Sequence, residues 1–254
     1  MAARDRAEQK ANEWINRLVV KLGPVETMRV ATNMLATIDD VSANRWEAAK
    51  ERADSMDGLL RPEKIELLTR SIARELAATG AAAGAAAAAP TVGTSATIVA
   101  TLSELVWFTG RVGDLVLTIA ALHGRDDPTV DERRAWVLAV LIYGSSARDG
   151  FSRAVNEATI GKSVAADGRL PITTIQMANR FMSKALLRTY GSRRGLAALG
   201  RLLPAGIGAA VGGTTNYLAV RALARNADQF FARLPYSAID AESTDITGRQ
   251  LDAS

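Results

Sequence analysis

Apolar residues recur at steps of three and four along most of this chain, which is the spacing of one face of an α-helix. The longest face of this kind is formed by Leu105, Phe108, Val112, Leu115, Ile119 and Leu122. Thr129 and Glu132 have the spacing of a capping box, which predicts that a further helix begins there and continues to Tyr143. No segment alternates between apolar and polar residues as a half-buried strand would. The pattern therefore predicts an all-α, multi-helix bundle.

Two stretches, residues 76–103 and 202–220, contain no charged residue and are rich in alanine and glycine. Each holds a G-x-x-x-G pair, namely Gly80 with Gly84 and Gly208 with Gly212. This spacing puts both glycines on one helix face, so another backbone can approach closely. Pro90 interrupts the first stretch. We therefore predict a central Ala/Gly-rich helical hairpin and a Gly-rich C-terminal helix that pack together.

Both stretches are about as long as a bilayer-spanning helix, which needs roughly 20 apolar residues. Alanine and glycine favour transfer into lipid only weakly, however, compared with leucine and isoleucine. The chain is thus expected to be a peripheral or soluble helical protein, and whether these helices enter lipid is left open.

Breaks in the pattern divide the rest of the chain. A helix is predicted over residues 25–38, with Asp39 or Asp40 as the N-cap of the next segment, and Pro62 stands where another helix can begin. From these breaks we predict an N-terminal helical cap over residues 1–61, a helical domain over 62–234 and a disordered tail over 235–254.

Composition limits the chemistry. The 254 residues are 48% hydrophobic and only 5% aromatic, which suits closely packed helices with a real core. Cysteine is absent and there is one histidine, so thiolate zinc sites and histidine-rich metal clusters are excluded. We expect no cofactor.

The polar N-terminus has no apolar signal region, which favours a cytoplasmic location, and a net charge of +4 permits but does not require anionic partners.

Asp114 lies inside an otherwise apolar helical segment, and a buried carboxylate needs a partner. The candidate partners are Arg111, Arg133 and Arg134. A structural ion pair between helices is the favoured interpretation, and a general acid or metal ligand is the alternative. A divalent cation could also be held by Asp126, Asp127 and Asp131, although they lack the glycine and glutamate of a helix–loop–helix calcium site.

His123 is the one histidine, at a predicted helix end where positive charge is favourable. A catalytic triad built on it would need Asp126 or Asp127 to orient the ring, together with a serine nucleophile. No G-x-S-x-G elbow supplies that serine. A structural loop histidine is therefore the favoured interpretation.

Basic residues gather just before the second Gly-rich stretch, at Arg188, Arg193, Arg194 and Arg201. Arginines beside an apolar helix suit a surface of anionic lipid headgroups, although a solvated face would look the same. Nucleic-acid binding is not expected, because no known motif is present and aromatic residues for base stacking are scarce.

Several motifs resemble the EcsC family of bacterial proteins over roughly residues 62–231. They are Asp114-Leu115, Ile119-Ala120, Gly124-x-Asp126, Asp131 with Arg133-Arg134, the tract AVLIYG that ends at Tyr143-Gly144, and a glycine-rich segment from Leu203-Pro204 to Asn216. The resemblance implies a bacterial, membrane-associated or cytoplasmic helical protein, linked to a transporter or another membrane process. It carries no catalytic residues over to this chain.

Taken together, these observations predict a non-enzymatic, membrane-peripheral helical protein on the inner face of the cell membrane. Its partner would be an anionic membrane surface or a membrane protein. One alternative is a lipid or phosphoester hydrolase with a polar centre at Asp114, His123, Asp126 and Asp127, and another is a soluble scaffold.

Overall fold

A computed structural model describes residues 24–87, 94–159, 170–192, 212–234 and 238–239 of the chain. The longer helices are α2 (Pro24–Asn44), α3 (Trp46–Asp54), α4 (Arg61–Ala87), α5 (Thr94–Leu122), α6 (Val130–Tyr143), α7 (Ala147–Ala158), α8 (Ile172–Tyr190) and α10 (Gly212–Ala232). A short 3-10 turn, η1 (Gly144–Ser146), joins α6 to α7. The protein is thus all-α in its described parts, as the sequence pattern predicts.

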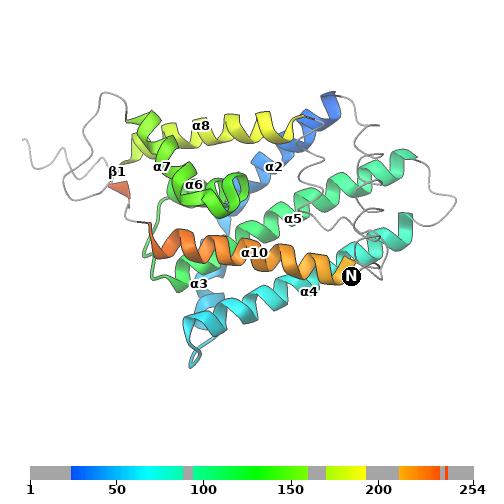
Figure 1. The fold of residues 1–254 in the computed structure, drawn as a ribbon, viewed down its shortest axis with the longest axis horizontal. Coiled ribbons are helices and arrows are strands. Elements are labelled where there is room, and N and C mark those ends of the chain that lie inside the picture. Colours follow the sequence, from blue (N-terminus) through cyan, green and yellow to red (C-terminus); the bar gives the residue numbers. More distant parts are fainter. Residues whose placement is uncertain (1–23, 88–93, 160–169, 193–211, 235–237, 240–254) are drawn as a thin grey trace, which may run out of the picture.

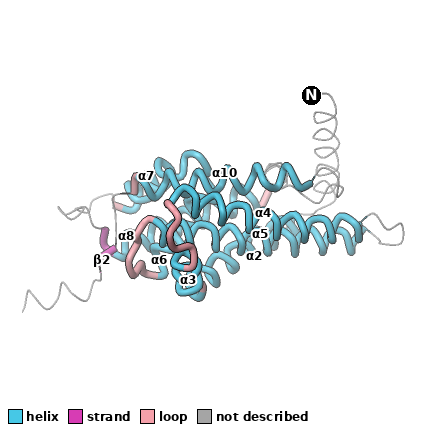
Figure 2. Tube along the Cα trace, turned by 90° about the horizontal axis from the view of Figure 1, so that it is seen from below, coloured by secondary structure: helices cyan, strands magenta, loops and turns pink. Residues whose placement is uncertain are grey.

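The helices form two groups that share α5 (Figure 1). Helices α4, α5 and α10 pack on one another, with α4 running opposite to the other two. Helices α2, α6, α7 and α8 form the second group, and α2 and α6 rest against α5. Helices α4 and α5 follow the long axis of the molecule, and Figure 2 shows the same arrangement after a 90° turn. The predicted hairpin and the predicted packing of α10 on α4 are both present.

The core forms where the helical apolar faces meet. On α5 the predicted face is buried from Leu105 to Ile119, while Leu122 at the end is half-buried. Helix α6 is buried on nearly all sides, as expected of a central helix that lies between α2, α7 and α8. Its start is fixed by the predicted capping box: the Glu132 amide donates to Thr129 Oγ1 at 3.2 Å, and the Thr129 amide donates to the Glu132 carboxylate at 2.8 Å.

Helices α2 and α5 approach each other closely because α5 carries glycine on the facing side. A Cβ added at Gly113 would lie 2.6 Å from Cγ1 of Val41, which is completely buried. One turn earlier, a Cβ at Gly110 would lie 3.6 Å from Thr37. Gly113 therefore sets the distance between these two helices. That distance determines whether side chains at the end of α2 can reach α5.

The structure corrects two predictions of local structure. Asp39 and Asp40 are not an N-cap, because α2 continues through both to Asn44 and the break falls at Arg45. A two-residue parallel strand pair, β1 (Leu170–Pro171) with β2 (Ala238–Ile239), was not predicted and is too short for any alternating pattern to be visible. Strand β2 consists of two residues of the stretch 235–254, which was expected to be a disordered tail. Helices α2 and α3 share one hydrophobic core with the helices that follow.

Candidate functional site

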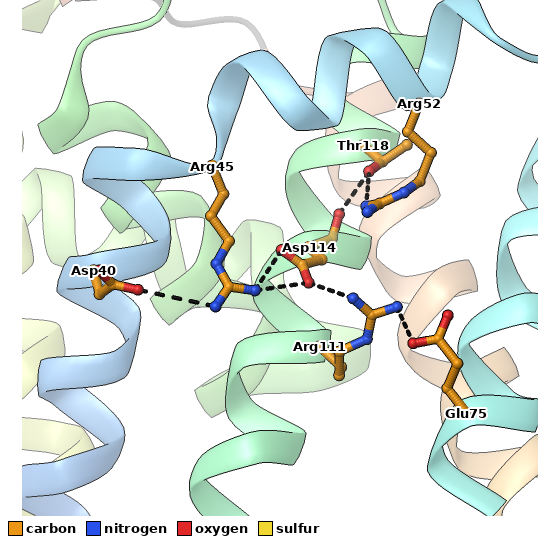
Figure 3. Close-up of polar contacts among 7 residues, drawn as sticks. All are labelled: Asp40, Arg45, Arg52, Glu75, Arg111, Asp114 and Thr118. Carbon is orange, nitrogen blue, oxygen red and sulfur yellow. Dashed lines mark hydrogen bonds and ion pairs between the residues drawn. The ribbon is translucent and has the colours of Figure 1, made fainter. Parts of the chain in front are cut away.

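Asp114 lies near the middle of α5 with its side chain 5% exposed, between two arginines (Figure 3). Arg45, at the junction of α2 and α3, donates from Nη1 to both carboxylate oxygens, at 3.3 and 3.1 Å. Arg111, one turn earlier on α5, donates from Nη1 to Oδ2 at 2.7 Å. The predicted ion pair with Arg111 is therefore present within α5, and the pair that links α5 to the α2–α3 junction is made by Arg45, which was not predicted.

Both arginines reach a second carboxylate farther from the centre. Arg45 lies 4.0 Å from Asp40 of α2, and Arg111 pairs with Glu75 of α4 (Figure 3). Asp40, Arg45, Asp114, Arg111 and Glu75 thus form a row of alternating charge, which we call the Asp114 cluster. The row ties α2, α4 and α5 together, and its centre is buried while both ends are open to solvent.

A hydroxyl beside the cluster adds a further link. Thr118 Oγ1 donates to the backbone oxygen of Asp114 at 2.7 Å and accepts from Arg52 of α3 at 3.4 Å (Figure 3). Arg45 and Arg52 therefore both direct their guanidinium groups from the α2–α3 region onto α5. The arrangement neutralises a buried carboxylate, which is the condition for keeping such a group inside a protein.

The chemistry open to Asp114 is limited by these contacts. Both carboxylate oxygens accept hydrogen bonds from guanidinium groups, and the side chain is 5% exposed, so little of it is open to a substrate. In the described part of the chain no three of the side chains that bind metals are grouped closely enough to hold an ion. The role the geometry supports is to hold helices together.

The sequence identified only one of the two arginines. Arg45 is separated from Asp114 by 69 residues, and no local pattern links them. Arg133 and Arg134, the other predicted partners, lie elsewhere: Arg133 stacks over the ring of Trp46 at 6.0 Å, and Arg134 pairs with Asp39 of α2. Burial lowers the pKa of Arg133. Both arginines of α6 therefore bind the N-terminal helices rather than Asp114.

His123 forms a second polar contact, directly after the C-terminal end of α5. Its Nε2 lies 2.8 Å from Asp228 Oδ1 of α10, and its ring packs near Phe231 at 6.0 Å. Arg125, two residues on, donates to the backbone oxygens of Phe231 and Leu234 at 3.0 and 2.8 Å, where α10 ends. The carboxylate beside His123 is thus Asp228, not the predicted Asp126 or Asp127, and the group fastens the end of α10 to the end of α5.

Burial lowers the pKa of His123 from its ordinary value of 6.5, and the attraction of Asp228 opposes this shift without cancelling it. The folded protein therefore favours the neutral ring. As the pH falls below 6.5, the unfolded chain takes up the proton more readily, so His123 makes the free energy of unfolding decrease toward acid. We expect His123→Gln, which keeps a polar contact to Asp228 but cannot titrate, to remove this part of the decrease.

The measurement is urea denaturation of both proteins between about pH 8 and pH 5, which spans the titration of histidine. The relevant quantity is the difference between the two proteins, because carboxylates that do not contact residue 123 contribute equally to both curves. A difference that is constant over this range, or wild-type stability that rises toward acid relative to the variant, would contradict the assignment.

The remaining predicted site residues are spread over the fold. Asp126 is exposed in the loop after α5, and Asp127 beside it has a positive φ of 41°. Tyr143 ends α6, is half-buried, and lies under the guanidinium of Arg153 at 5.9 Å. Burial raises its pKa. No described contact joins Asp126, Asp127 or Tyr143 to Asp114 or His123. Asp114 and His123 are themselves about 13 Å apart along the α5 axis, at 1.5 Å per residue.

The glycines and the basic residues of the predicted membrane contact are described only in part. Gly80 and Gly84 lie within α4, Gly212 begins α10, and Asn216 lies in its first turns. Arg188 is exposed in the last turn of α8. Gly208 and the other predicted contact arginines, Arg193, Arg194 and Arg201, lie outside the described residues.

Beyond Glu75 on α4 and before Glu104 on α5, neither helix carries a charged residue. We call residues 77–87 and 94–103 the uncharged arm. Its two helical segments are each roughly 15–17 Å long at 1.5 Å per residue. Figures 1 and 2 show the far ends of α4 and α5 extending past the described ends of α2, α8 and α10. The arm is therefore an uncharged projection from a charged body.

One described helix segment, Leu105–Leu122 of α5, is long and apolar enough to cross a membrane. Because 72% of it is buried among the other helices, it serves here as the core helix of the bundle. The uncharged arm precedes this segment on α5 and is distinct from it.

Comparison with known proteins gives no relative from which a role could be transferred. No family model, no curated protein and no solved structure matches this chain. The likeness to the EcsC family remains a prediction from short motifs.

Proposed function

We propose that this protein is a non-enzymatic, membrane-peripheral protein that docks on a bilayer through its uncharged arm. The observation that carries the proposal is the arm itself: two helix ends without charge that project beyond a body rich in charged side chains. A surface helix that points into water normally carries charged residues on its outer face. Their absence over both segments favours an apolar environment.

The length of the arm suggests how deep it reaches. Each segment is roughly 15–17 Å long, about half of the 30 Å hydrocarbon core of a bilayer. A hairpin of this size would enter one leaflet without crossing to the other. This is the geometry of a monotopic protein, and it agrees with the weak drive of alanine and glycine into lipid.

Basic residues would supply the second contact that stable docking of a short apolar segment needs. Arg188 lies in the last turn of α8, at the end of the body from which the arm projects (Figure 1). Helix α8 carries Arg180, Lys184 and Arg188 and no acidic residue. A juxtamembrane cation contributes about 1 kcal/mol near an anionic leaflet. The proposed location is therefore the inner, anionic face of the cell membrane, where a transporter or another membrane protein could be the partner.

No observation in the described residues favours the hydrolase. Asp114 is held between two arginines, His123 contacts Asp228, and Asp126 lies exposed in a loop. A soluble scaffold differs from a membrane-docking protein in one measurable way, because a scaffold does not bind lipid.

The test is cosedimentation of the purified full-length chain with anionic and neutral vesicles at low and high salt. We expect binding to anionic vesicles that weakens in high salt, since exposed charges are screened, but persists in part, since apolar contacts are not. Binding to neutral vesicles should be weaker. Absence of binding to anionic vesicles at low salt would overturn the proposal and favour the scaffold.

A further inference from the structure

A groove lies where the C-terminal end of α2, the first two turns of α6 and the first half of α8 meet. Its volume is about 570 Å³, within the usual size range of small-ligand sites. The polar side chains that line it are Asp39, Asp131, Arg134, Gln176, Asn179 and Arg180. All three helices contribute buried residues to the hydrophobic core, so the walls of the groove are fixed in position.

The two carboxylates of the groove already have donors from its own walls. Asp39 accepts a hydrogen bond from Nε of Arg134. Asp131 Oδ2 accepts from Gln176 Nε2 at 2.9 Å, and the buried Asn179 donates from Nδ2 to the Asp131 backbone oxygen at 2.8 Å. These contacts join α2 to α6 and α6 to α8. Asp39 and Asp131 are therefore structural acceptors, and a ligand is not needed to supply donors to them.

The two guanidinium groups, in contrast, keep donors that no described residue uses. Arg134 is 20% exposed and contacts Asp39 only through Nε. Its two terminal nitrogens are not among the fully buried unpaired atoms of the described chain, so solvent reaches them. Arg180 is exposed and forms no ion pair with a described residue. Because both arginines line the groove, a molecule held there can accept hydrogen bonds from both.

Apolar surface lies beside these donors. Val130, the first residue of α6, is 45% exposed, and Ala43 near the end of α2 is exposed as well. Both residues line the groove. Small-ligand sites usually combine apolar walls with a few polar groups that fix the orientation of the ligand. A ligand that carries an anionic head and a short apolar part would use both kinds of surface.

We propose that the groove binds a small monocarboxylic acid with a short hydrocarbon chain. Arg134 and Arg180 hold the carboxylate, because planar guanidinium groups match its two oxygens. The hydrocarbon chain lies on Val130 and Ala43. The lining holds two carboxylates and two guanidinium groups, so its formal charge is zero. A head with one negative charge is therefore favoured over a dianion such as a phosphate monoester.

Such an acid can be free in solution or can be a fatty acid held in a membrane, and experiment separates the two sources. The groove lies in the helix group that does not include α4 and α10, so the proposal does not depend on docking of the uncharged arm. A protein that fails to bind anionic vesicles can still bind a free acid, and the reverse is equally measurable.

The first measurement is an NMR titration of the full-length chain with hexanoate and, separately, with hexanamide. The two have the same chain and nearly the same shape, but the amide head carries no charge. We expect hexanoate to bind about tenfold more tightly, the effect of losing a charge-assisted hydrogen bond. Equal affinities would overturn the proposal. So would absence of hexanoate binding up to about 10 mM together with absence of Arg180-dependent binding to fatty-acid vesicles.

Two further ligands test the chain and the charge of the head. Acetate has the carboxylate without the hydrocarbon and should bind at least tenfold more weakly than hexanoate. Hexyl phosphate at pH 8 is a dianion, since the second pKa of a phosphate monoester is about 6, and it should bind no more tightly than hexanoate. Tighter binding of hexyl phosphate would contradict the assignment to a monocarboxylate.

Variants then assign the effect to the groove. Arg180→Gln, at an exposed position, should weaken hexanoate binding about five- to tenfold and leave hexanamide binding unchanged. Lys184→Gln is the matched control, because Lys184 lies one turn farther along the exposed side of α8 and does not line the groove. Equal losses in both variants would mean that general charge rather than this site is responsible.

Val130→Ser tests the apolar wall. It should weaken binding of hexanoate and hexanamide by the same factor, about fourfold for a buried methylene-sized contact, because both ligands carry the same chain. Unchanged affinities for both ligands would contradict the placement of the hydrocarbon on Val130.

Phosphatidylcholine vesicles with and without oleate repeat the comparison with the acid held in a membrane. Binding that depends on Arg180 only with oleate vesicles assigns the site to a membrane fatty acid, and dependence only with hexanoate assigns it to a soluble acid.

Discussion

Replacing Asp114 with alanine is expected to lower the free energy of unfolding by about 3–5 kcal/mol, the usual cost of removing one partner from a buried charge network. The variant would leave Arg111, which is 15% exposed, with Glu75 alone, and Arg45, which is 42% exposed, with Asp40 alone, so the site between them would hold no negative charge. Neither guanidinium can lose its proton to relieve the situation. Urea denaturation followed by circular dichroism measures the effect.

The ends of the Asp114 cluster provide the control. Asp40 is 55% exposed and 4.0 Å from Arg45, so Asp40→Ala should cost less than about 1 kcal/mol. Asp114→Asn separates charge from shape, because it keeps the size of the side chain and removes the ion pairs. A loss below about 1 kcal/mol for Asp114→Ala would show that the arginines find other acceptors and that the cluster does not hold the helices together.

The position of the cluster gives this prediction a functional meaning. Glu75 is the last charged residue of α4 before the uncharged arm, and through Arg111 it is joined to Asp114 and so to the body. The Asp114 cluster thus fixes the root of the hairpin against α2 and α3. If the uncharged arm enters a leaflet, the Asp114 cluster fixes the orientation of the arm relative to the rest of the molecule.

Features encoded by neighbouring residues could be predicted from the sequence. The apolar face of α5, the capping box at Thr129 and Glu132, and the pair of helices that ends at Ala87 and resumes at Thr94 all depend on residues within a few turns of one another. The helical character of the chain follows from the same local periodicity. The predicted end of α2 was wrong because Asp39 and Asp40 can either cap a helix or lie on its exposed side. Only the packing of Val41 and Ser42 into the core decides between these two possibilities.

Contacts between distant residues could not be predicted. Arg45 is 69 residues from Asp114, and Asp228 is 105 residues from His123, so no spacing rule connects either pair. The sequence shows that a buried carboxylate needs a cation. It does not show which arginine lies beside Asp114 in the folded chain.

Placing charge in the uncharged arm is expected to produce the largest loss of membrane binding. An aspartate at the centre of a bilayer helix costs about 2.5–3.5 kcal/mol, so one buried charge lowers the affinity about a hundredfold. We therefore expect Ala86→Asp combined with Ala96→Asp, one residue in each segment of the arm, to reduce vesicle binding at least that much at any salt concentration. Cosedimentation over a range of lipid concentrations gives the ratio of affinities.

The control must change the net charge equally without touching the arm. Thr32→Asp with Asn33→Asp does so, since both positions are exposed on α2. This pair adds the same repulsion from anionic lipid, so it should weaken binding only at low salt, where surface charges act over long distances. Equal losses in the two double variants would mean that attraction of charge alone holds the protein on the membrane. A loss of vesicle binding that occurs only in the arm variant, and that persists in high salt where electrostatic effects are screened, would identify the uncharged helices as the part that enters the lipid.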